Sequence, residues 1–202
     1  MKILVTGGTG FIGSHTCCEL LDSGYEVVVI DNFSNSQPGV IEKIKKITGK
    51  DFKFYEGDVF DKGLLNKIFT ENKIDAVIHF AGYKAVGESV SKQLMYYRNN
   101  IDSTLSLLET MDEFGCKKIA FSSSATVYGK PKSLPIKEDF SLSTTNPYGS
   151  TKLMIEDILR DLYVSDNSWS IAILRYFNPI GAHKSGLIGE NPNDIPNNLM
   201  PY

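Results

Sequence analysis

Tyr148 and Lys152 stand four residues apart in a segment with helical periodicity, so a phenol and an ammonium share one face of a predicted helix. A free tyrosine titrates near a pH of about 10, too high for an efficient base at neutral pH. A neighbouring ammonium favours the phenolate and lowers the pKa of the phenol. Ser124, at the end of a predicted strand, is able to bridge the phenol and a substrate hydroxyl. Tyrosine–lysine pairs at this spacing are common on helix surfaces, and the catalytic interpretation therefore depends on the motifs around them.

A glycine-rich turn provides the first of these motifs. Gly7, Gly10 and Gly13 follow an apolar run directly and open a helical pattern. Glycine permits a positive φ at such a turn and lets the backbone approach a pyrophosphate without an intervening Cβ. The helix N-terminus supplies free N–H groups and the positive end of its dipole. The alternative is a tight strand–helix turn without a ligand, but the position between strand and helix favours dinucleotide binding.

Polar and small residues at later strand ends extend this site. Asp31 closes the second predicted strand, where a carboxylate accepts hydrogen bonds from the adenine ribose and repels a 2′-phosphate. The residues after it include no arginine, so NAD is predicted rather than NADP; the alternative for Asp31 is a simple helix or turn cap. Asp58 follows the third predicted strand, and Phe80, Ala81 and Gly82 end the fourth. Each of these could be only a turn, but their shared position at strand ends predicts one cofactor lining.

The elements that must position these residues alternate along the chain. Short apolar runs predict strands at 2–6, 26–31, 52–56, 75–80, 117–122 and 170–176, and helical patterns fall near 11–23, 38–48, 61–72, 92–114 and 147–164. This alternation is typical of a parallel sheet with crossover helices. We therefore expect an α/β fold with a doubly wound parallel sheet, the Rossmann fold, over residues 1–177. From 178 the segment is rich in glycine, asparagine and proline and lacks periodicity, which predicts an irregular functional loop region over 178–202.

Composition excludes several classes of function. The chain has 202 residues, 42% of them hydrophobic, and a net charge of -3, which offers no electrostatic footing for nucleic acid or an anionic membrane. No apolar stretch approaches the length of a membrane span or a secretory signal. Cys17, Cys18 and Cys116 are expected to be reduced and buried, which suits the cytoplasm. The three histidines have no metal-ligand spacing, so no metal is predicted, and His15 and His79 are expected to be structural.

Longer runs of residues, given together here, resemble the nucleotide-sugar epimerases of the extended short-chain dehydrogenase/reductase superfamily. The resemblance covers essentially the whole chain and is carried by residues 31–36 (DNFSNS), 79–89 (HFAGYKAVGES), 122–129 (SSSATVYG), 174–179 (LRYFNP) and 195–202 (IPNNLMPY), besides the glycine turn and the Tyr148–Lys152 pair. Runs of this length are far more specific than three glycines.

The resemblance implies an NAD-dependent epimerase that interconverts UDP-glucose and UDP-galactose. Tyr148 would take the proton of the 4-hydroxyl while hydride leaves C4, and hydride would return to the other face of a 4-keto sugar; Lys152 would also hold the nicotinamide ribose. Further residues implied in NAD binding are Phe11, Ile12, Asn32, Asn35, Ser36, Val59, Lys84, Asn99 and Phe177, and those implied in UDP-sugar binding, with Ser124 and Tyr148, are Asn178, Asn197, Asn198 and Leu199. Members of the superfamily continue well past this length, so residues 178–202 are expected to be the incomplete start of a smaller UDP-sugar-binding domain, and this shortened chain is not expected to turn over efficiently alone.

Two alternatives remain from the residues. Dehydratases and decarboxylases share the fold, but dehydratases carry an acidic pair just after the serine, where this chain has Ala125 and Thr126. A module that binds NAD without turnover is the other alternative. A homodimer is also expected, because the predicted helix over 92–114 carries enough apolar surface for a dimer interface; packing into the core is the alternative explanation for the same side chains.

Overall fold

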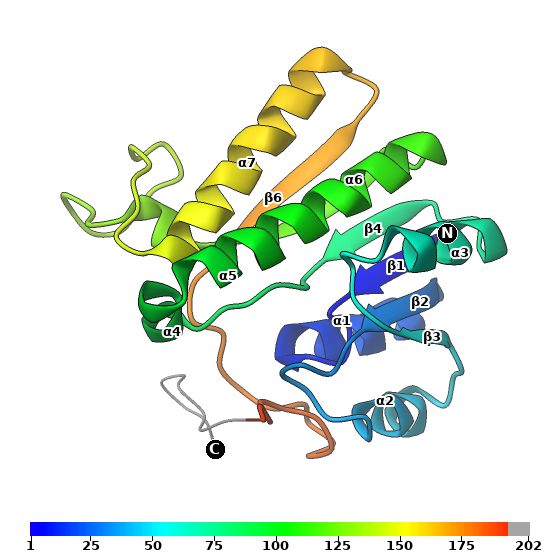
Figure 1. The fold of residues 1–202 in the computed structure, drawn as a ribbon. Coiled ribbons are helices and arrows are strands. Elements are labelled where there is room, and N and C mark those ends of the chain that lie inside the picture. The colour runs from blue at the N-terminus through cyan, green and yellow to red at the C-terminus, as the bar shows by residue number, and fades with distance from the viewer. Residues whose placement is uncertain (194–202) are drawn as a thin grey trace.

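The fold is a single parallel sheet between two layers of helices, shown in the computed structural model in Figure 1, which describes residues 1–193. The elements, in chain order, are β1 Lys2–Thr6, α1 Phe11–Asp22, β2 Glu26–Asp31, α2 Val40–Thr48, β3 Lys53–Glu56, α3 Lys62–Glu71, β4 Ala76–His79, α4 Val86–Ser91, α5 Gln93–Tyr97, a π-helical segment Arg98–Asp102, α6 Ser103–Glu113, β5 Lys118–Ser124, a 3-10 turn Ala125–Tyr128, α7 Pro147–Ser165 and β6 Ser170–Tyr176.

The sheet has the strand order β3-β2-β1-β4-β5-β6, with all pairs parallel. The chain moves outward from β1 to β3, then returns to place β4 on the other side of β1. This reversal creates a crevice at the carboxyl ends of β1 and β4, the place where ligands bind in open α/β sheets. The predicted doubly wound parallel sheet is confirmed.

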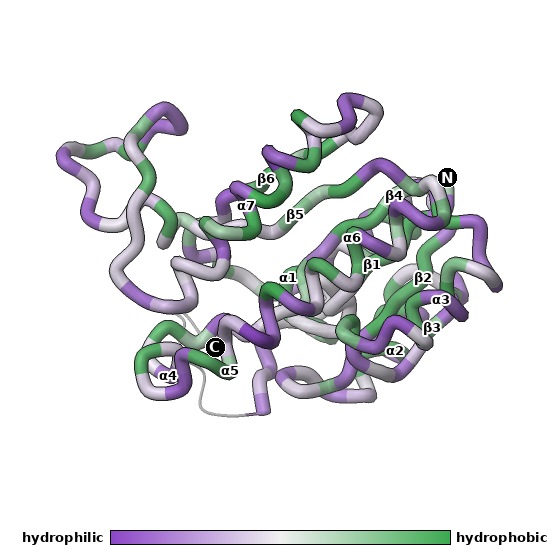
Figure 2. Tube along the Cα trace, turned by 45° about the horizontal axis from the view of Figure 1, so that its top comes forward, coloured by the Kyte–Doolittle hydropathy of each residue, from purple (hydrophilic) through white to green (hydrophobic). Residues whose placement is uncertain are grey.

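Two apolar cores lie on opposite faces of the sheet because strand side chains alternate in direction. Leu4 and Val28 face the core formed with α3, α6 and α7, whereas Ile3 and Val29 face the smaller core formed with α1 and α2. Figure 1 shows α6 and α7 on one side of the strands and α1 and α2 below them. Figure 2 shows hydrophobic residues along β2 and β5 and an alternation of hydrophobic and hydrophilic residues along α6.

The predicted bounds of β1, β2 and β6 are confirmed, whereas the ends of β3, β4 and β5 differ from the predicted ones by one or two residues. β5 continues to Ser124 instead of ending at 122, because it pairs with β6 up to the register Ser124↔Tyr176. Among the described residues, β6 has neighbours packed on one of its two faces. Ile171 and Ile173 on that face pack against the larger core, whereas Leu174 on the other face is 43% exposed.

The helix predicted over 92–114 is confirmed over Gln93–Glu113, but it contains a π-helical segment between α5 and α6. It is preceded by the short α4, which the sequence pattern did not predict. The π-helical segment surrounds Asn100, which is 2% exposed and whose side chain exchanges hydrogen bonds with the backbone of Tyr83. A buried side chain satisfied by a distant loop therefore sets the local helical geometry, and the spacing of apolar residues does not reveal it.

Candidate functional site

The glycine turn after β1 is packed too closely for side chains. Gly7 has a φ of 68°, and a Cβ added there would lie 2.8 Å from the backbone nitrogen of Ala81. A Cβ on Gly13 would overlap the carbonyl oxygen of Gly7. The turn therefore lets α1 start directly against the ends of β1 and β4, with no Cβ between the backbone and a ligand.

The first turn of α1 presents backbone N–H groups to the crevice. The helix starts after Gly10, and within residues 1–193 no side chain caps this end and its first turn has no acidic residue. The first N–H groups of a helix have no partner within the helix, and the dipole is positive there. A pyrophosphate fits such an end, and the glycines leave it room to approach.

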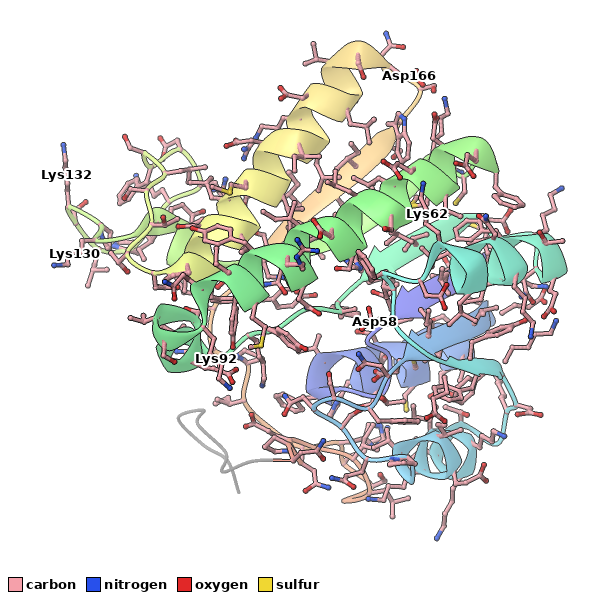
Figure 3. All side chains as sticks on the ribbon, viewed as in Figure 1. Asp58, Lys62, Lys92, Lys130, Lys132 and Asp166 are labelled. Atoms are coloured by element: carbon pink, nitrogen blue, oxygen red, sulfur yellow. The ribbon has the colours of Figure 1, made fainter. Side chains whose placement is uncertain are left out.

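The adenine end of the crevice is defined by a fixed carboxylate. Asp31 is 9% exposed, and its two oxygens accept hydrogen bonds from the backbone nitrogens of Thr9, at 3.0 Å, and Phe33, at 2.9 Å. Asn32 donates a hydrogen bond of 3.0 Å to Asp58, which Figure 3 shows on the segment that follows β3, toward α1. Within the described part of the chain no arginine lines the crevice. This arrangement fits a ribose with free hydroxyls better than a 2′-phosphate.

A cavity of about 680 Å³ joins the predicted residues along the carboxyl ends of the strands. Its lining includes every position predicted for the cofactor: Gly7, Gly10, Phe11, Ile12, Gly13, Asp31, Asn32, Asn35, Ser36, Asp58, Val59, Phe80, Ala81, Gly82, Lys84, Asn99, Ser124, Tyr148, Lys152 and Phe177. Of the residues predicted for the substrate, Asn178 also lines it, whereas Asn197, Asn198 and Leu199 lie outside the described residues.

Tyr148, Ser124 and Lys152 meet at one end of this cavity. Tyr148 is the second residue of α7, a helix capped by the Asn146 side chain, which accepts a hydrogen bond from the nitrogen of Gly149 at 2.8 Å. Ser124 is the last residue of β5. Lys152 is 5% exposed, and its Nζ donates to the carbonyl oxygen of Ser122 at 2.7 Å. That Nζ lies 6.0 Å from the centroid of the Tyr148 ring. The helical spacing predicted from sequence thus places the phenol and the ammonium on the same side of α7.

The electrostatics of the pair differ from the prediction. Burial raises the pKa of Tyr148 above its ordinary value, and the hydrogen bond with Ser124 lowers it only in part. The ammonium of Lys152 is held by a backbone carbonyl, and burial lowers its own pKa to about 8. In the chain alone the pKa of the phenol is therefore raised, contrary to the prediction that Lys152 lowers it, because desolvation of the phenol is the largest contribution.

A strap of chain covers the cavity in a way that the sequence did not reveal. Residues 178–193 run from the end of β6 back toward the adenine end. The Nζ atom of Lys84 lies 3.4 Å from Oε1 of Glu190. The side-chain amide of Asn193 donates hydrogen bonds to the carbonyl oxygens of Phe33 and Ser34, at 3.1 Å each. The asparagine-rich composition indicated a functional loop, but its partners are more than 100 positions away in the sequence.

Several other lining residues were missed. Thr9, Ser122, Thr126 and Tyr176 all line the cavity. Thr126 donates to Ser124 through its backbone nitrogen at 3.2 Å and through its hydroxyl at 3.0 Å. The signal for Thr126 was its position two residues after Ser124, which the sequence had already marked as a candidate. Nothing in the local pattern distinguishes Tyr176 from an ordinary strand residue.

The histidine and cysteine predictions can be compared with the structure. His79 is 1% exposed and bonded to the hydroxyls of Thr6 and Thr104, at 2.7 and 3.1 Å. All three cysteines are free and buried. Within residues 1–193 no cluster of three metal-ligating side chains occurs. No helix in the same range has the length and apolar character needed to cross a membrane.

Comparison with known proteins agrees with this geometry. The model of the NAD dependent epimerase/dehydratase family matches residues 3–202. The UDP-glucose 4-epimerase of Bacillus subtilis (strain 168) is 64% identical over 202 residues, which cover 100% of this chain and 60% of the relative. The corresponding enzyme of Haemophilus influenzae is 61% identical over 203 residues, again with 100% and 60% covered.

Solved structures of similar proteins share both the fold and much of the sequence. The UDP-glucose 4-epimerase from Bifidobacterium longum, in complex with NAD+ and UDP, has a TM-score of 0.96 and 58% identity, covering 97% of this chain and 59% of that one. The enzyme from Stenotrophomonas maltophila, with bound NAD and formylated UDP-arabinopyranose, has a TM-score of 0.97 and 47% identity, covering 100% and 60%. The chain thus spans about 60% of the length of these relatives.

Proposed function

Because the chain belongs to the NAD dependent epimerase/dehydratase family, we propose that it binds NAD and serves the interconversion of UDP-glucose and UDP-galactose. One observation carries the proposal: all twenty predicted cofactor positions line a single cavity, and the Tyr148 phenol and Ser124 hydroxyl stand at one end of it. The relatives that carry this activity by name are 57–64% identical over this part of their length.

In this proposal the cofactor lies along the strand ends, with its pyrophosphate over the first turn of α1 and its adenine ribose at Asp31. NAD, when bound, supplies a positively charged ring that accepts a hydride and gives it back. The roles of the other lining residues follow the family pattern, with Lys152 directed to the nicotinamide ribose and Asn178 to the UDP-sugar. Asn197, Asn198 and Leu199 are proposed for the UDP-sugar on the resemblance alone.

The chain's own residues account for the proton chemistry. Tyr148 takes the proton of the hexose 4-hydroxyl through Ser124 as hydride leaves C4, and returns it to the 4-keto oxygen as hydride comes back, so over the cycle the sugar gains or loses neither protons nor electrons. The phenol needs a positive neighbour for this role, since burial alone raises its pKa. An epimerase is favoured over a dehydratase because the two residues after Ser124 are Ala125 and Thr126, and Thr126 is engaged in hydrogen bonds to Ser124.

The assignment of the chain to two functional regions is also a proposal. Residues 1–177 form the NAD-binding Rossmann domain, and 178–202 begin the region that binds the UDP-sugar. The free, buried thiols suit a reducing compartment such as the cytoplasm, where enzymes of galactose metabolism act on UDP-sugars. Exposed apolar side chains on α5, α6 and α7, among them Leu94 at 79% exposure and Met154 at 45%, suit a homodimer interface.

A direct assay tests the function. The purified chain is incubated with UDP-galactose and NAD, and the anomeric proton signals of UDP-glucose are followed by NMR. We expect conversion with NAD, slow in a chain that spans about 60% of the length of its relatives, and none with NADP as the matched control, because Asp31 repels a 2′-phosphate. Conversion supported equally by NADP would contradict the assignment of Asp31. Bound NAD without conversion would support the alternative of a cofactor-binding module.

A further inference from the structure

Glu156 is a buried charge that the proposed chemistry does not use. Its side chain is 0% exposed, in the middle of α7. It follows Lys152 by one helical turn and Tyr148 by two, so the three side chains share one face of the helix. A fully buried carboxylate is rare unless it is paired, which directs attention to its partners.

The partners of Glu156 come from three elements. Its Oε1 accepts from the hydroxyl of Ser123 in β5, at 2.5 Å, and from Nε of Arg175 in β6, at 3.0 Å. Its Oε2 accepts from Nη2 of Arg175, at 2.8 Å, and from Nη2 of Arg160 in α7, at 2.6 Å. The side-on pairing with Arg175 fixes the plane of both groups, because a guanidinium and a carboxylate bind through two parallel hydrogen bonds.

The carboxylate remains charged in this setting. Burial raises the pKa of Glu156, but the hydrogen bonds from Arg175, Ser123 and Arg160 outweigh burial and hold the pKa below its ordinary value. Arg175 also donates to the hydroxyl of Tyr128 at 2.9 Å. Without the carboxylate, Arg175, whose side chain is only 16% exposed, would be a poorly compensated cation.

Two adjacent residues of β5 connect to α7 immediately before Ser124. Lys152 donates to the carbonyl oxygen of Ser122, and Glu156 accepts from the hydroxyl of Ser123. The next residue, Ser124, makes the hydrogen bond that lowers the pKa of the Tyr148 phenol. The distance between Ser124 and Tyr148 therefore depends on how α7 is seated along β5.

We propose that Glu156 is a positioning residue that fixes α7 against the ends of β5 and β6 and so keeps Tyr148 beside Ser124 in the cavity. The inference rests on the proposed function only for the chemical roles of Tyr148 and Ser124. The alternative is that the Glu156 cluster contributes stability alone.

The test measures the ionisation of Tyr148 directly. The full chain is labelled with 13C at the tyrosine ζ carbon and titrated in the presence of NAD, and the Tyr148→Phe variant identifies the signal. The groups that face the phenol are Ser124 from β5 and Lys152 from α7, and neither is altered in the test variants. We expect the midpoint of the Tyr148 titration to rise by about 1 pH unit in Glu156→Gln and in Ser123→Ala, because a shift of that size corresponds to the free energy of one lost hydrogen bond.

Asp157→Asn is the matched control. Asp157 is the neighbouring carboxylate, is 64% exposed and pairs with the same Arg160, but it has no bond to β5 or β6. Its midpoint should stay at the wild-type value. Unchanged midpoints in both test variants, with only a lower melting temperature, would overturn the proposal and leave a stabilising role. Ser123→Ala removes a single hydroxyl, so it decides the matter even if Glu156→Gln does not fold.

Kinetics separate this proposal from the proposed function. Where the wild-type chain converts UDP-galactose, both test variants should lower kcat about 10-fold while KM stays within about twofold, because the lost position affects proton transfer more than binding. A rise in KM of about 10-fold with an unchanged kcat would contradict the positioning role of Glu156. If the wild type does not convert the sugar, the proposed function fails, and the tyrosine titration still decides the role of Glu156.

Discussion

Around β1 and β2 the cavity is defined by backbone features, the glycine turn and the start of α1, whereas around β5 and α7 it is defined by polar side chains. The first region has the glycine turn, the uncapped start of α1 and a single carboxylate held by two backbone nitrogens. The second has a phenol, a hydroxyl and an ammonium whose positions depend on the seating of α7 on β5. The comparison indicates that holding a dinucleotide and moving a proton are separable tasks. Lys130 and Lys132, which Figure 3 shows extending outward on the loop before α7, are remote from both regions.

The largest effect that separates the two regions is expected at Tyr148. Tyr148→Phe removes the base and keeps the ring, so conversion of UDP-galactose should fall about 1000-fold, in the range usual for a lost general base. NAD affinity should change by less than about threefold, because the backbone region is untouched. Rate measurement together with calorimetric NAD titration checks both. Full activity in this variant would remove the basis for the catalytic assignment.

At Gly13, in the first region, we expect a substitution to weaken NAD binding and leave the proton-transfer residues in place. Gly13→Ala places a methyl group against the Gly7 carbonyl oxygen and 2.8 Å from the Cα of Gly8, so the turn must shift. We expect NAD affinity to fall about 100-fold, or about 2.7 kcal/mol. Gly39→Ala is the matched control, since nothing lies within 4 Å of a Cβ there. Equal NAD affinity for the two variants would show that the turn does not carry the pyrophosphate.

A smaller, pH-dependent effect is expected where the two regions join, at His79 of β4. Burial, with a further contribution from Lys152, lowers its pKa to about 3. The unfolded chain holds a proton on this residue below a pH of about 6.5, so the folded state loses about 1.4 kcal/mol per pH unit as the pH falls below that value. Urea unfolding between pH 7 and 5 should show a shallower decline for His79→Gln. The same substitution at His183, which bonds only within its own loop, should keep the wild-type slope.

The smallest effect is expected at the strap. Asn193→Ala removes the hydrogen bonds to the carbonyl oxygens of Phe33 and Ser34 near the adenine end. Because these bonds are exposed, NAD should dissociate only about threefold faster, measured by stopped-flow displacement. Lys184→Ala, an exposed substitution in the same segment, should leave the dissociation rate unchanged. An unchanged rate for Asn193→Ala would mean that the strap does not retain the cofactor.

The sequence by itself determined the sheet and the local motifs. Parallel strands are predictable because buried apolar runs alternate with helical patterns, and the glycine turn is predictable because only glycine fits a positive φ against a neighbouring backbone. Tyr148 and Lys152 were predictable for the same local reason, as their spacing matches a helical turn. Asn178 required the family resemblance.

Only the tertiary structure decided how these local pieces act on one another. The pKa of Tyr148 is raised rather than lowered because burial is a property of the packed chain. The π-helical segment within the helix over 92–114 surrounds Asn100, whose side chain reaches the backbone of Tyr83. The Glu156 cluster joins Ser123 to Arg175, residues 52 positions apart in the printed sequence (175 − 123). Hydrogen bonds and desolvation depend on neighbours in space, and spacing along the chain does not encode them until the sheet has brought β5, α7 and β6 together.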